Sequence, residues 1–332
     1  MEMRKKHWTK ILIMKKLLLC VGLGITIQSA FAQSNYPQRT IRIISPTSPG
    51  SGSDIVARLL AQGLSKKFGK PVIVENRVGA GTMIGSELVA KANPDGYTLL
   101  LGISTLAINP STFKSLAYDA IRDFAPITQT VSASNLMVIH PSMPVKTVKE
   151  FIHFAKSRPG EVIYASAGFG TNPHLAIELF ANMAKIKMVH VPYQGDAPSI
   201  VDLIGGHVTM TISPVPRSLP LVLSGRLKAL GLTSATRLTA APKIPTIAES
   251  GLAGYEAVQW YGLLAPANTP HEIINTLYKE SVAILKSSEG SESFSQTYMD
   301  VVASSPEQFA QFIKAETLKW SQVSKAVGIV PQ

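Results

Sequence analysis

Two stretches of the sequence combine glycine and serine with the start of a helical pattern, and turns of this kind commonly hold anions. The first is SPTSPGSGSDIVARLL (residues 45–60) and the second is VIYASAGFGTNPHLAIELF (residues 162–180). In each stretch a strand-like run ends, glycines break the chain and a helix follows. Exposed backbone amides and the positive end of the helix dipole would together attract a carboxylate or a phosphate. One such loop is often purely structural, but a matched pair favours ligand binding.

The residues around the two loops are typical of helix starts. Ser51 or Ser53 can cap the first helix, and Asp54 in its first turn suits the helix dipole. In the second stretch we expect Asn172 to be the cap, because the proline after it fits the first helical position. His174 opens this second helix beside the glycines and could touch a ligand.

The spacing of the reactive residues does not match established catalytic motifs. Neither loop is a phosphate loop or a dinucleotide-binding fingerprint. Ser104 lies in G-x-S-x-L rather than in the nucleophile motif G-x-S-x-G. The segment HEIIN begins like a zinc helix but has Asn275 where the second histidine belongs. Asp54 and Asp196 could act as bases, but capping and solvation are commoner roles for aspartate. We therefore predict no catalytic residues, no metal and no cofactor.

The first 32 residues have the pattern of a secretory signal peptide. Lys15 and Lys16 precede an apolar run over residues 17–27, and Ala30-Phe31-Ala32 forms a cleavage site. The apolar run is shorter than the roughly 20 residues that a membrane span needs. We therefore expect export from the cytoplasm and a mature chain that begins at Gln33.

Cleavage at that site would change both the charge and the redox chemistry of the chain. The remaining 300 residues contain 26 Lys and Arg (32 less 6) and 20 Asp and Glu (21 less 1), which gives a net charge of +6. The only cysteine, Cys20, would be removed, so disulfides and thiol catalysis are excluded. A mildly positive chain suits an anionic ligand. Basic runs interleaved with aromatic residues are missing, which argues against a nucleic-acid partner.

Strand-like and helical patterns alternate along most of the chain. Apolar residues recur four positions apart at Val56, Leu60 and Leu64, and again at Leu175 and Leu179, which predicts helices with one buried face. This alternation predicts an α/β protein with largely parallel sheets. A chain of 300 residues exceeds what one core usually supports, so two lobes are expected. Strands are predicted at residues 40–45, 71–76, 97–104, 135–141, 162–167, 188–193, 208–213, 227–234 and 261–266.

Several motifs together resemble a known family. ENRVGAG, PDGYTLL, YASAGFGTNPHLAIELF and HVPYQG occur in this order, and the similarity extends over essentially the whole mature chain. In these segments the chain resembles the extracytoplasmic solute receptors of tripartite tricarboxylate transporters, the Bug-type family. The resemblance implies a two-lobe periplasmic binding protein of type II, which closes around a small carboxylate like a flytrap.

The resemblance also implies where the lobes and the ligand contacts lie. The first lobe would comprise residues 33–135 and 260–332, the second would comprise residues 136–259, and residues 1–32 would be the signal peptide. The two glycine-rich loops would grip the ligand carboxylate largely through main-chain amides. The contacts would be Pro49, Gly50, Ser51, Gly52, Asp54, Ser104 and Thr105 in the first lobe, and Ser166, Ala167, Gly168, Gly170, Thr171, His174, Gly195 and Asp196 in the second, where the aspartate could meet an amine or a hydroxyl.

The chain departs from the family pattern at positions where ligand identity would be read. Thr47 replaces an aromatic residue and Ser51 replaces a glycine in the first loop, and Thr209 and Ser213 occupy a strand that often carries acids. The resemblance implies a monomer that delivers a carboxylate to large and small membrane subunits of a transporter. A sensory protein that contacts a histidine kinase would share the same site, and a secreted enzyme acting on an acid or amide is a third alternative.

Overall fold

The computed structural model describes residues 36–331 except residue 239, and the predicted signal peptide lies outside the described residues. All the elements below belong to the unit Arg39–Gln332. None of the helices that the structure describes combines the length and the apolar character that a membrane span requires.

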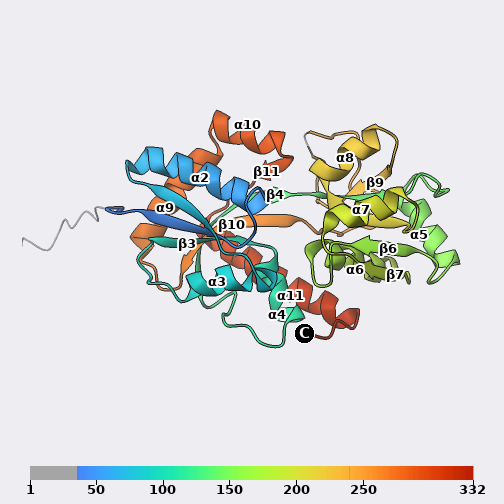
Figure 1. Ribbon diagram of the computed structural model, residues 1–332, viewed down its shortest axis with the longest axis horizontal. Coiled ribbons are helices and arrows are strands. Elements are labelled where there is room, and N and C mark those ends of the chain that lie inside the picture. Colours follow the sequence, from blue (N-terminus) through green and yellow to red (C-terminus); the bar gives the residue numbers. More distant parts are fainter. Residues whose placement is uncertain (1–35, 239, 332) are drawn as a thin grey trace, which may run out of the picture. The chain divides into compact units, whose positions relative to one another are not determined.

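A six-stranded sheet with helices on both faces forms one part of the fold (Figure 1). Its strand order is β11-β4-β10-β3-β1-β2. Helices α2 and α9 pack together on one face, and α3, α4 and α11 lie on the other. The strands are β1 (Ile41–Ser45), β2 (Val72–Asn76), β3 (Thr98–Ile103), β4 (Phe124–Ala133), β10 (Gln259–Pro266) and β11 (Met299–Val301). The helices are α2 (Gly52–Phe68), α3 (Met83–Ala90), α4 (Thr105–Thr112), α9 (His271–Leu285), α10 (Ser288–Gln296) and α11 (Pro306–Ala326), with a short 3-10 helix, η1 (Ala80–Thr82).

The middle of the chain forms a second sheet of five strands, in the order β7-β6-β8-β5-β9. Phe151 of α5 packs against Phe180 of α6 on one side of this sheet, and Leu203 of α7 and Leu219 of α8 share a separate buried cluster. The strands are β5 (Asn135–Ile139), β6 (Ile163–Ser166), β7 (Val189–Pro192), β8 (Met210–Pro214) and β9 (Lys228–Leu232). The helices are α5 (Val148–Ser157), α6 (Asn172–Ala184), α7 (Asp196–Ile204) and α8 (Val215–Leu223).

The α/β class is confirmed, but the expectation of largely parallel sheets is wrong. β1 pairs in parallel with β2 and β3, and β6 pairs in parallel with β7 and β8. β10 runs antiparallel to β3 and β4, and β5 runs antiparallel to β8 and β9. Both sheets are therefore mixed. The antiparallel strands β5 and β10 are those with which the chain enters a sheet after crossing from the other one.

The chain crosses between the sheets at two places. β4 ends at Ala133 in the first sheet, and β5 begins at Asn135 in the second. The return runs from the end of β9 at Leu232 to the start of β10 at Gln259. Near the crossings, the Asn135 amide donates to the Thr233 hydroxyl at 2.9 Å, and the Ala257 amide donates to the Thr233 carbonyl at 2.9 Å. The two crossing segments are thus hydrogen-bonded to each other.

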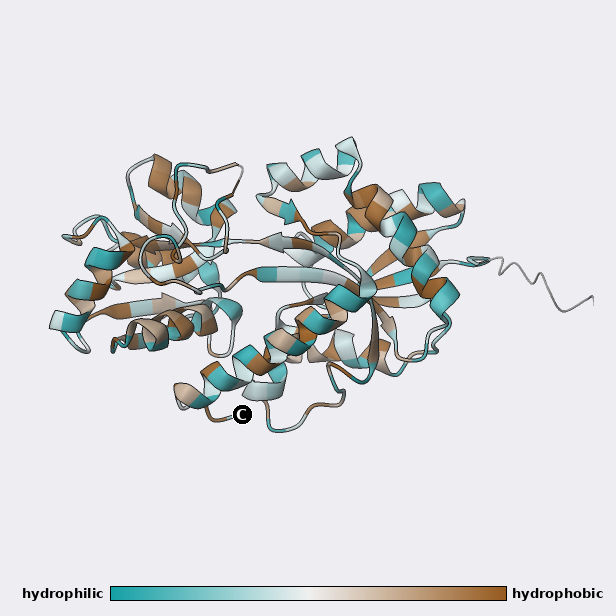
Figure 2. Ribbon diagram, turned by 180° about the vertical axis from the view of Figure 1, so that it is seen from behind, coloured by the Kyte–Doolittle hydropathy of each residue, from teal (hydrophilic) through white to brown (hydrophobic). Residues whose placement is uncertain are grey.

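The helices have the amphipathic character that the sequence predicts. Val56, Leu60 and Leu64 are completely buried on α2. Along α11, hydrophobic and hydrophilic residues lie side by side (Figure 2), and Phe309 and Trp320 are its fully buried aromatic residues. Each of these helices therefore covers its sheet with a stripe of apolar side chains.

Candidate functional site

The topology brings the predicted loops to two neighbouring sheet edges. Because β1 and β3 are parallel, their carboxyl ends share one edge, which the loops 46–51 and 104–105 follow. β6, β7 and β8 are likewise parallel, so residues 167–171 and 193–195 follow one edge of the second sheet. The crossing strands β4 and β5 join these two edges, since β4 ends and β5 begins there.

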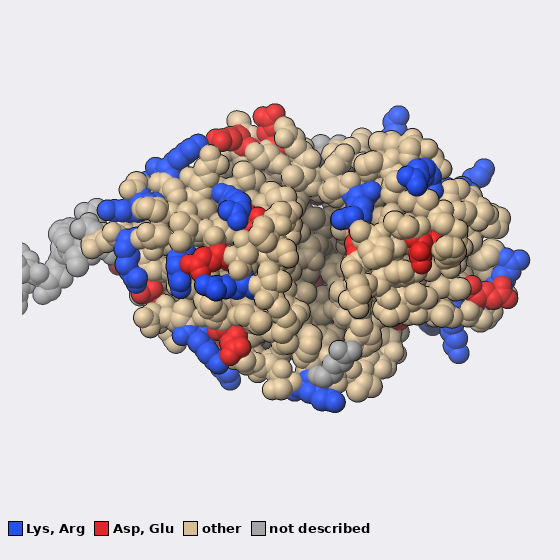
Figure 3. Space-filling view, in the orientation of Figure 1, with Lys and Arg blue, Asp and Glu red and all other residues tan. Residues whose placement is uncertain are grey.

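The two edges border a recess in the surface. Figure 3 shows the surface hollowed between the parts that carry the two sheets. A Cβ atom placed on Gly170 in the second sheet's loop would lie 3.5 Å from Thr112 Cγ2 on α4, which packs on the first sheet. The second loop therefore lies close to the end of α4, a helix of the first sheet.

Asp54 organises the first loop from inside. Its Oδ2 accepts hydrogen bonds from the Gly50 amide and from Arg58 Nε, both at 2.9 Å, and its Oδ1 accepts one from Asn76 Nδ2 at 2.9 Å. Burial alone would raise the pKa of Asp54, but these hydrogen bonds and the Arg58 charge outweigh it and lower the pKa. Both carboxylate oxygens and the Gly50 amide are thus engaged within the loop, so Asp54 shapes the loop.

The donors that the first loop can offer a ligand are neutral. Ser51 caps α2, with its Oγ accepting from the Asp54 amide at 3.4 Å, and the Thr47 hydroxyl contacts both Ser51 and Ser53. Gly52 and Ser53 occupy the first helical positions, where backbone amides have no acceptor within the helix. Two amides and a group of hydroxyls at the positive end of α2 suit a carboxylate.

Ser104 and Thr105 are the other ligand contacts predicted beside the first sheet, and Thr105 lies beside the segment 79–82. The sequence identified this segment only as part of a family motif. Ser104 is buried and donates to Gln259 Oε1 at 2.6 Å. The hydroxyl of Thr105 lies 2.6 Å from that of Thr82. Thr82 ends the segment 79–82, in which all four residues have positive φ. The sequence signal for this segment was the glycine pair in VGAGT, since glycine is the residue that adopts positive φ without strain.

The second loop presents an uncapped helix end. Gly168 has φ 130° and Gly170 has φ 73°. The Thr171 hydroxyl donates to the Gly168 carbonyl at 2.7 Å, so it makes no capping bond to α6. Pro173 has no N–H, so the free donors at the start of α6 are the amides of Asn172 and His174, which have no acceptor within the helix. These amides, next to the partly exposed Ala167, suit an external acceptor.

A stack of rings supports the second loop from beneath. His174 Nδ1 accepts from the Gly170 amide at 3.2 Å, and the His174 ring lies 4.2 Å from the His190 ring, which stacks on Tyr164 at 4.7 Å. Burial, and then the neighbouring His190, lowers the pKa of His174 to about 3. Burial lowers the pKa of His190 to about 4. Both imidazoles are neutral near pH 7, and His174, which is almost fully buried, holds the loop backbone.

Ser166 and His190 form a pair that resembles a catalytic dyad. The Ser166 Oγ lies 2.7 Å from His190 Nε2. Ser166 is fully buried, however, and its hydroxyl also accepts from the Gly168 amide at 3.2 Å. A nucleophile must reach its substrate, and a base with a pKa of about 4 takes up a serine proton poorly near pH 7. The pair therefore fixes the loop instead of presenting a reactive serine.

Asn172 does not have the role that the sequence predicted. Thr171 occupies the N-cap position, and Asn172 is the buried first residue of α6. Its side-chain oxygen accepts from Asn135 Nδ2 at 3.0 Å, and its Nδ2 donates to the Val258 carbonyl at 3.2 Å. The prediction of a cap is wrong because the side-chain amide of Asn172 is hydrogen-bonded to both crossing segments. These bonds tie the second loop to the crossings.

The loop 193–195 of the second sheet ends at Gly195, and Asp196 follows it as the first residue of α7. Gly195 has φ 107° and precedes α7 without a capping side chain. Asp196 Oδ2 accepts from the Ser213 hydroxyl at 3.0 Å and forms an ion pair with Arg217 Nε at 2.8 Å. Burial raises the pKa of Asp196, although the Ser213 hydrogen bond and the Arg217 charge oppose this. The sequence singled out Ser213 as a departure but did not identify Arg217.

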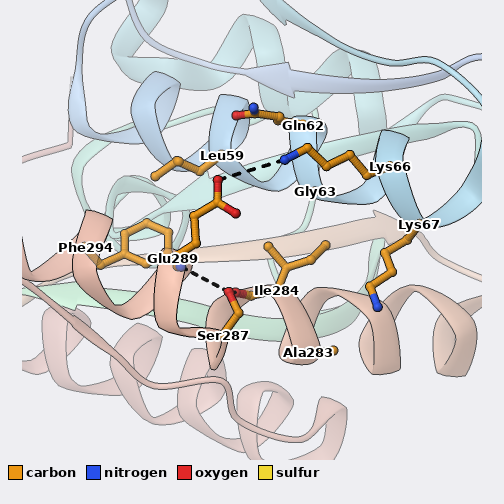
Figure 4. Close-up of a pocket in the computed structure, with 11 residues that line it drawn as sticks. Leu59, Gln62, Gly63, Lys66, Lys67, Ala283, Ile284, Ser287, Glu289 and Phe294 are labelled. Atoms are coloured by element: carbon orange, nitrogen blue, oxygen red, sulfur yellow. Dashed lines mark hydrogen bonds and ion pairs between the residues drawn. The ribbon is translucent and has the colours of Figure 1, made fainter.

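Other features of the described residues do not coincide with the loops. Groups of three or more His, Cys, Asp or Glu that could hold a metal ion are not found in the described part of the chain. A cavity of about 230 Å³ lies between α2 and the α9–α10 segment (Figure 4). Its walls include Leu59, Ile284 and Phe294, and at its rim Lys66 and the exposed Glu289 lie 4.0 Å apart. Since no loop residue lines it, this cavity is a gap between packed helices.

Comparison with known proteins identifies relatives that align with nearly the whole chain. Residues 56–329 match the family described as "Tripartite tricarboxylate transporter family receptor". The chain is 35% identical to the protein BugT of Bordetella pertussis over 320 residues, which cover 95% of this chain and 98% of BugT.

Solved structures show the same relationship in three dimensions. A structure of an R. palustris protein with adipate has a TM-score of 0.77 and 34% identity, and it covers 90% of this chain and 100% of that one. A structure of MatC from Rhodopseudomonas palustris with bound malate has a TM-score of 0.72 and 29% identity, and it covers 87% of this chain and 99% of that one. The chain therefore belongs to the tripartite tricarboxylate transporter receptor family and is a solute-binding protein of the Bug type.

Proposed function

We propose that this protein is a periplasmic receptor that binds a small organic carboxylate between its two lobes and delivers it to the membrane subunits of a tripartite tricarboxylate transporter. The observation that carries the proposal is the pair of loops at the starts of α2 and α6. Each follows the carboxyl end of a parallel strand, at the two sheet edges that the crossing from β4 to β5 joins. The proposed lobes comprise residues 33–135 with 260–332, and residues 136–259.

The chemistry of the loops supports a carboxylate as the ligand. Asp54, Ser166 and His174 use their polar atoms to hold the loop backbone. The groups left for a ligand are the amides at the starts of α2 and α6 and the hydroxyls near Thr47. These neutral donors and helix dipoles favour an anion, and they bind it without requiring a buried lysine or arginine. The adipate and malate of the two related structures are carboxylates.

Closure of the lobes follows from this distribution of donors. Each loop alone supplies only part of the coordination of a carboxylate, so a ligand held by one loop gains further hydrogen bonds when the other approaches. This difference in affinity shifts the protein towards the closed form. Changing the ratio of open to closed from 99:1 to 1:99 needs about 5.5 kcal/mol. A few charge-assisted hydrogen bonds of roughly 1.5–3 kcal/mol each suffice.

A thermal-shift screen of the mature chain against mono-, di- and tricarboxylates and amino acids tests the proposal. A ligand that binds only the native state stabilises it by about 2.7 kcal/mol at a hundredfold excess over Kd. Small-angle scattering with the best ligand should then show a smaller radius of gyration. An absence of stabilisation by every carboxylate would refute the proposed ligand class, and an unchanged radius at saturation would refute closure.

A further inference from the structure

Asp196 is not a free acceptor facing the recess, because its charge is already paired. The Asp196 side chain is 14% exposed, and its Oδ2 receives the Ser213 hydroxyl and the Arg217 guanidinium. Its other oxygen, Oδ1, is buried without a hydrogen-bond partner among the described residues. Arg217 is thus the positive group that compensates the Asp196 carboxylate.

Arg217 lies at the same sheet edge as the second loop. β6, β7 and β8 are parallel, so the elements that follow them begin at one edge. The loop 167–171 follows β6, Asp196 opens α7 after β7, and Arg217 lies in the first turn of α8 after β8. The Asp196–Arg217 ion pair, at 2.8 Å, therefore links two of the three helix starts at this edge of the second sheet.

The guanidinium retains donors that this pairing does not use. Asp196 contacts Nε, and the described residues provide no other carboxylate for Arg217. The Arg217 side chain is 51% exposed, so Nη1 and Nη2 can reach a further acceptor. The planar guanidinium matches a carboxylate through two parallel hydrogen bonds. The ion pair with Asp196 restricts the orientation of this group, which lowers the entropy that binding would otherwise cost.

We propose that Arg217 binds a second anionic group of the ligand and that Asp196 is a positioning residue for Arg217. This inference rests on the proposed function, in which the first carboxylate is held by the loop amides. It assigns the ligand to acids with two anionic groups, such as dicarboxylates. The same position disfavours an amine, because an ammonium group would meet the guanidinium.

Calorimetry with matched acids tests this assignment. The probes are succinate, glutarate and adipate, each paired with the monocarboxylate of equal carbon number, which is butyrate, pentanoate or hexanoate. We expect the wild type to bind at least one dicarboxylate about tenfold or more tightly than its partner, as one charge-assisted hydrogen-bonded pair allows. Arg217→Gln should remove this preference and leave the Kd of the monocarboxylate within about twofold.

Three further variants separate binding from effects on folding and net charge. Arg226→Gln makes the same charge change at an exposed residue in the turn before β9, at the opposite edge of the sheet, and should keep the preference. Arg217→Lys keeps the charge without the planar group and should keep part of it. Asp196→Asn should reduce dicarboxylate binding and leave monocarboxylate binding unchanged, whereas a purely structural role would weaken both.

The possible outcomes distinguish this inference from the proposed function. A wild type that binds no carboxylate would refute both. A wild type that binds succinate, glutarate and adipate no better than their partners would refute the inference alone. An Arg217→Gln variant that is folded by circular dichroism and keeps the dicarboxylate preference would also refute it.

Discussion

The close approach of Tyr261 to the start of α2 gives a quantitative test of how the first loop is held. A Cβ atom on Gly52 would overlap the Tyr261 hydroxyl, and it would lie 3.0 Å from Tyr261 Cζ and 3.3 Å from Met299 Cε. Tyr261 lies on β10 and is 8% exposed, and burial raises its pKa to about 12. The ring is buried in the sheet's core, so Gly52→Ala must displace either the packed ring or the loop.

The expected magnitude follows from two opposing effects. Overpacking in a close-packed region costs about 1–3 kcal/mol, and alanine gains at most about 1 kcal/mol over glycine in a helix. Gly52→Ala should therefore lower the free energy of unfolding by about 1–2 kcal/mol and weaken carboxylate binding, because Gly52 supplies one of the amides at the start of α2.

A double-mutant cycle with Tyr261→Phe isolates the contact. Removing the hydroxyl relieves the overlap, so the double variant should be more stable than the sum of the single changes by about 1 kcal/mol. Urea unfolding supplies the stabilities, and the m-value shows whether the unfolded state has changed. The reasoning is refuted if Gly52→Ala is as stable as the wild type and binds equally well, or if the two changes are additive.

Three further predictions concern the same loops. Gly168→Val should abolish carboxylate binding in calorimetry, because φ 130° strains a branched residue, while Ser166→Ala should only weaken it; a folded valine variant with normal affinity would contradict this. The pKa values of His174 and His190 are about 3 and 4 in the folded protein, below the value of about 6.5 for an unfolded histidine. The unfolded chain therefore binds more protons as the pH decreases from about 6.5 to 4, and the free energy of unfolding should fall by at most about 1.4 kcal/mol per histidine and pH unit. His190→Phe should give a shallower slope in urea unfolding, and an equal slope would count against the assignment. Asp54→Asn should destabilise the protein by about 1–3 kcal/mol at pH 7, because the Gly50 amide and Arg58 Nε lose the charged oxygen that accepts their hydrogen bonds. Unchanged urea unfolding would show that the carboxylate is dispensable.

The strands were predictable where an apolar run was short and continuous. All nine predicted strands are present, from β1 to β10 with the exception of β4. β4 was missed because Thr128, Gln129 and Thr130 interrupt its apolar pattern. These residues are buried, and hydrogen bonds satisfy the two threonine hydroxyls: Thr128 donates to the Ser304 carbonyl at 2.8 Å and Thr130 donates to the Tyr261 carbonyl at 3.0 Å. Partners more than 100 residues away make this strand stable, and a local pattern does not contain them.

The positions of the site residues were more predictable than their roles. The glycine-rich loops lie where the sequence placed them, at the starts of α2 and α6. The expected contact of Asp54 with the ligand stays a prediction, and the structure adds that its carboxylate holds Gly50, Arg58 and Asn76. Asn172 was assigned to a cap, but it joins the crossing segments. An aspartate or asparagine at a helix start is compatible with each of these roles, and only the surrounding side chains distinguish them.

Periodicity, glycine positions and motifs within short segments were therefore sufficient to predict the α/β class, the helix starts and the family. Three features became visible only in the folded chain: both sheets are mixed, the crossings bring the two loop edges together, and Asp196 is paired with Arg217 across two helix starts. Strand direction and the partner of a buried charge depend on contacts between residues distant in the chain. Such contacts become favourable only when the fold has brought the groups within hydrogen-bond distance.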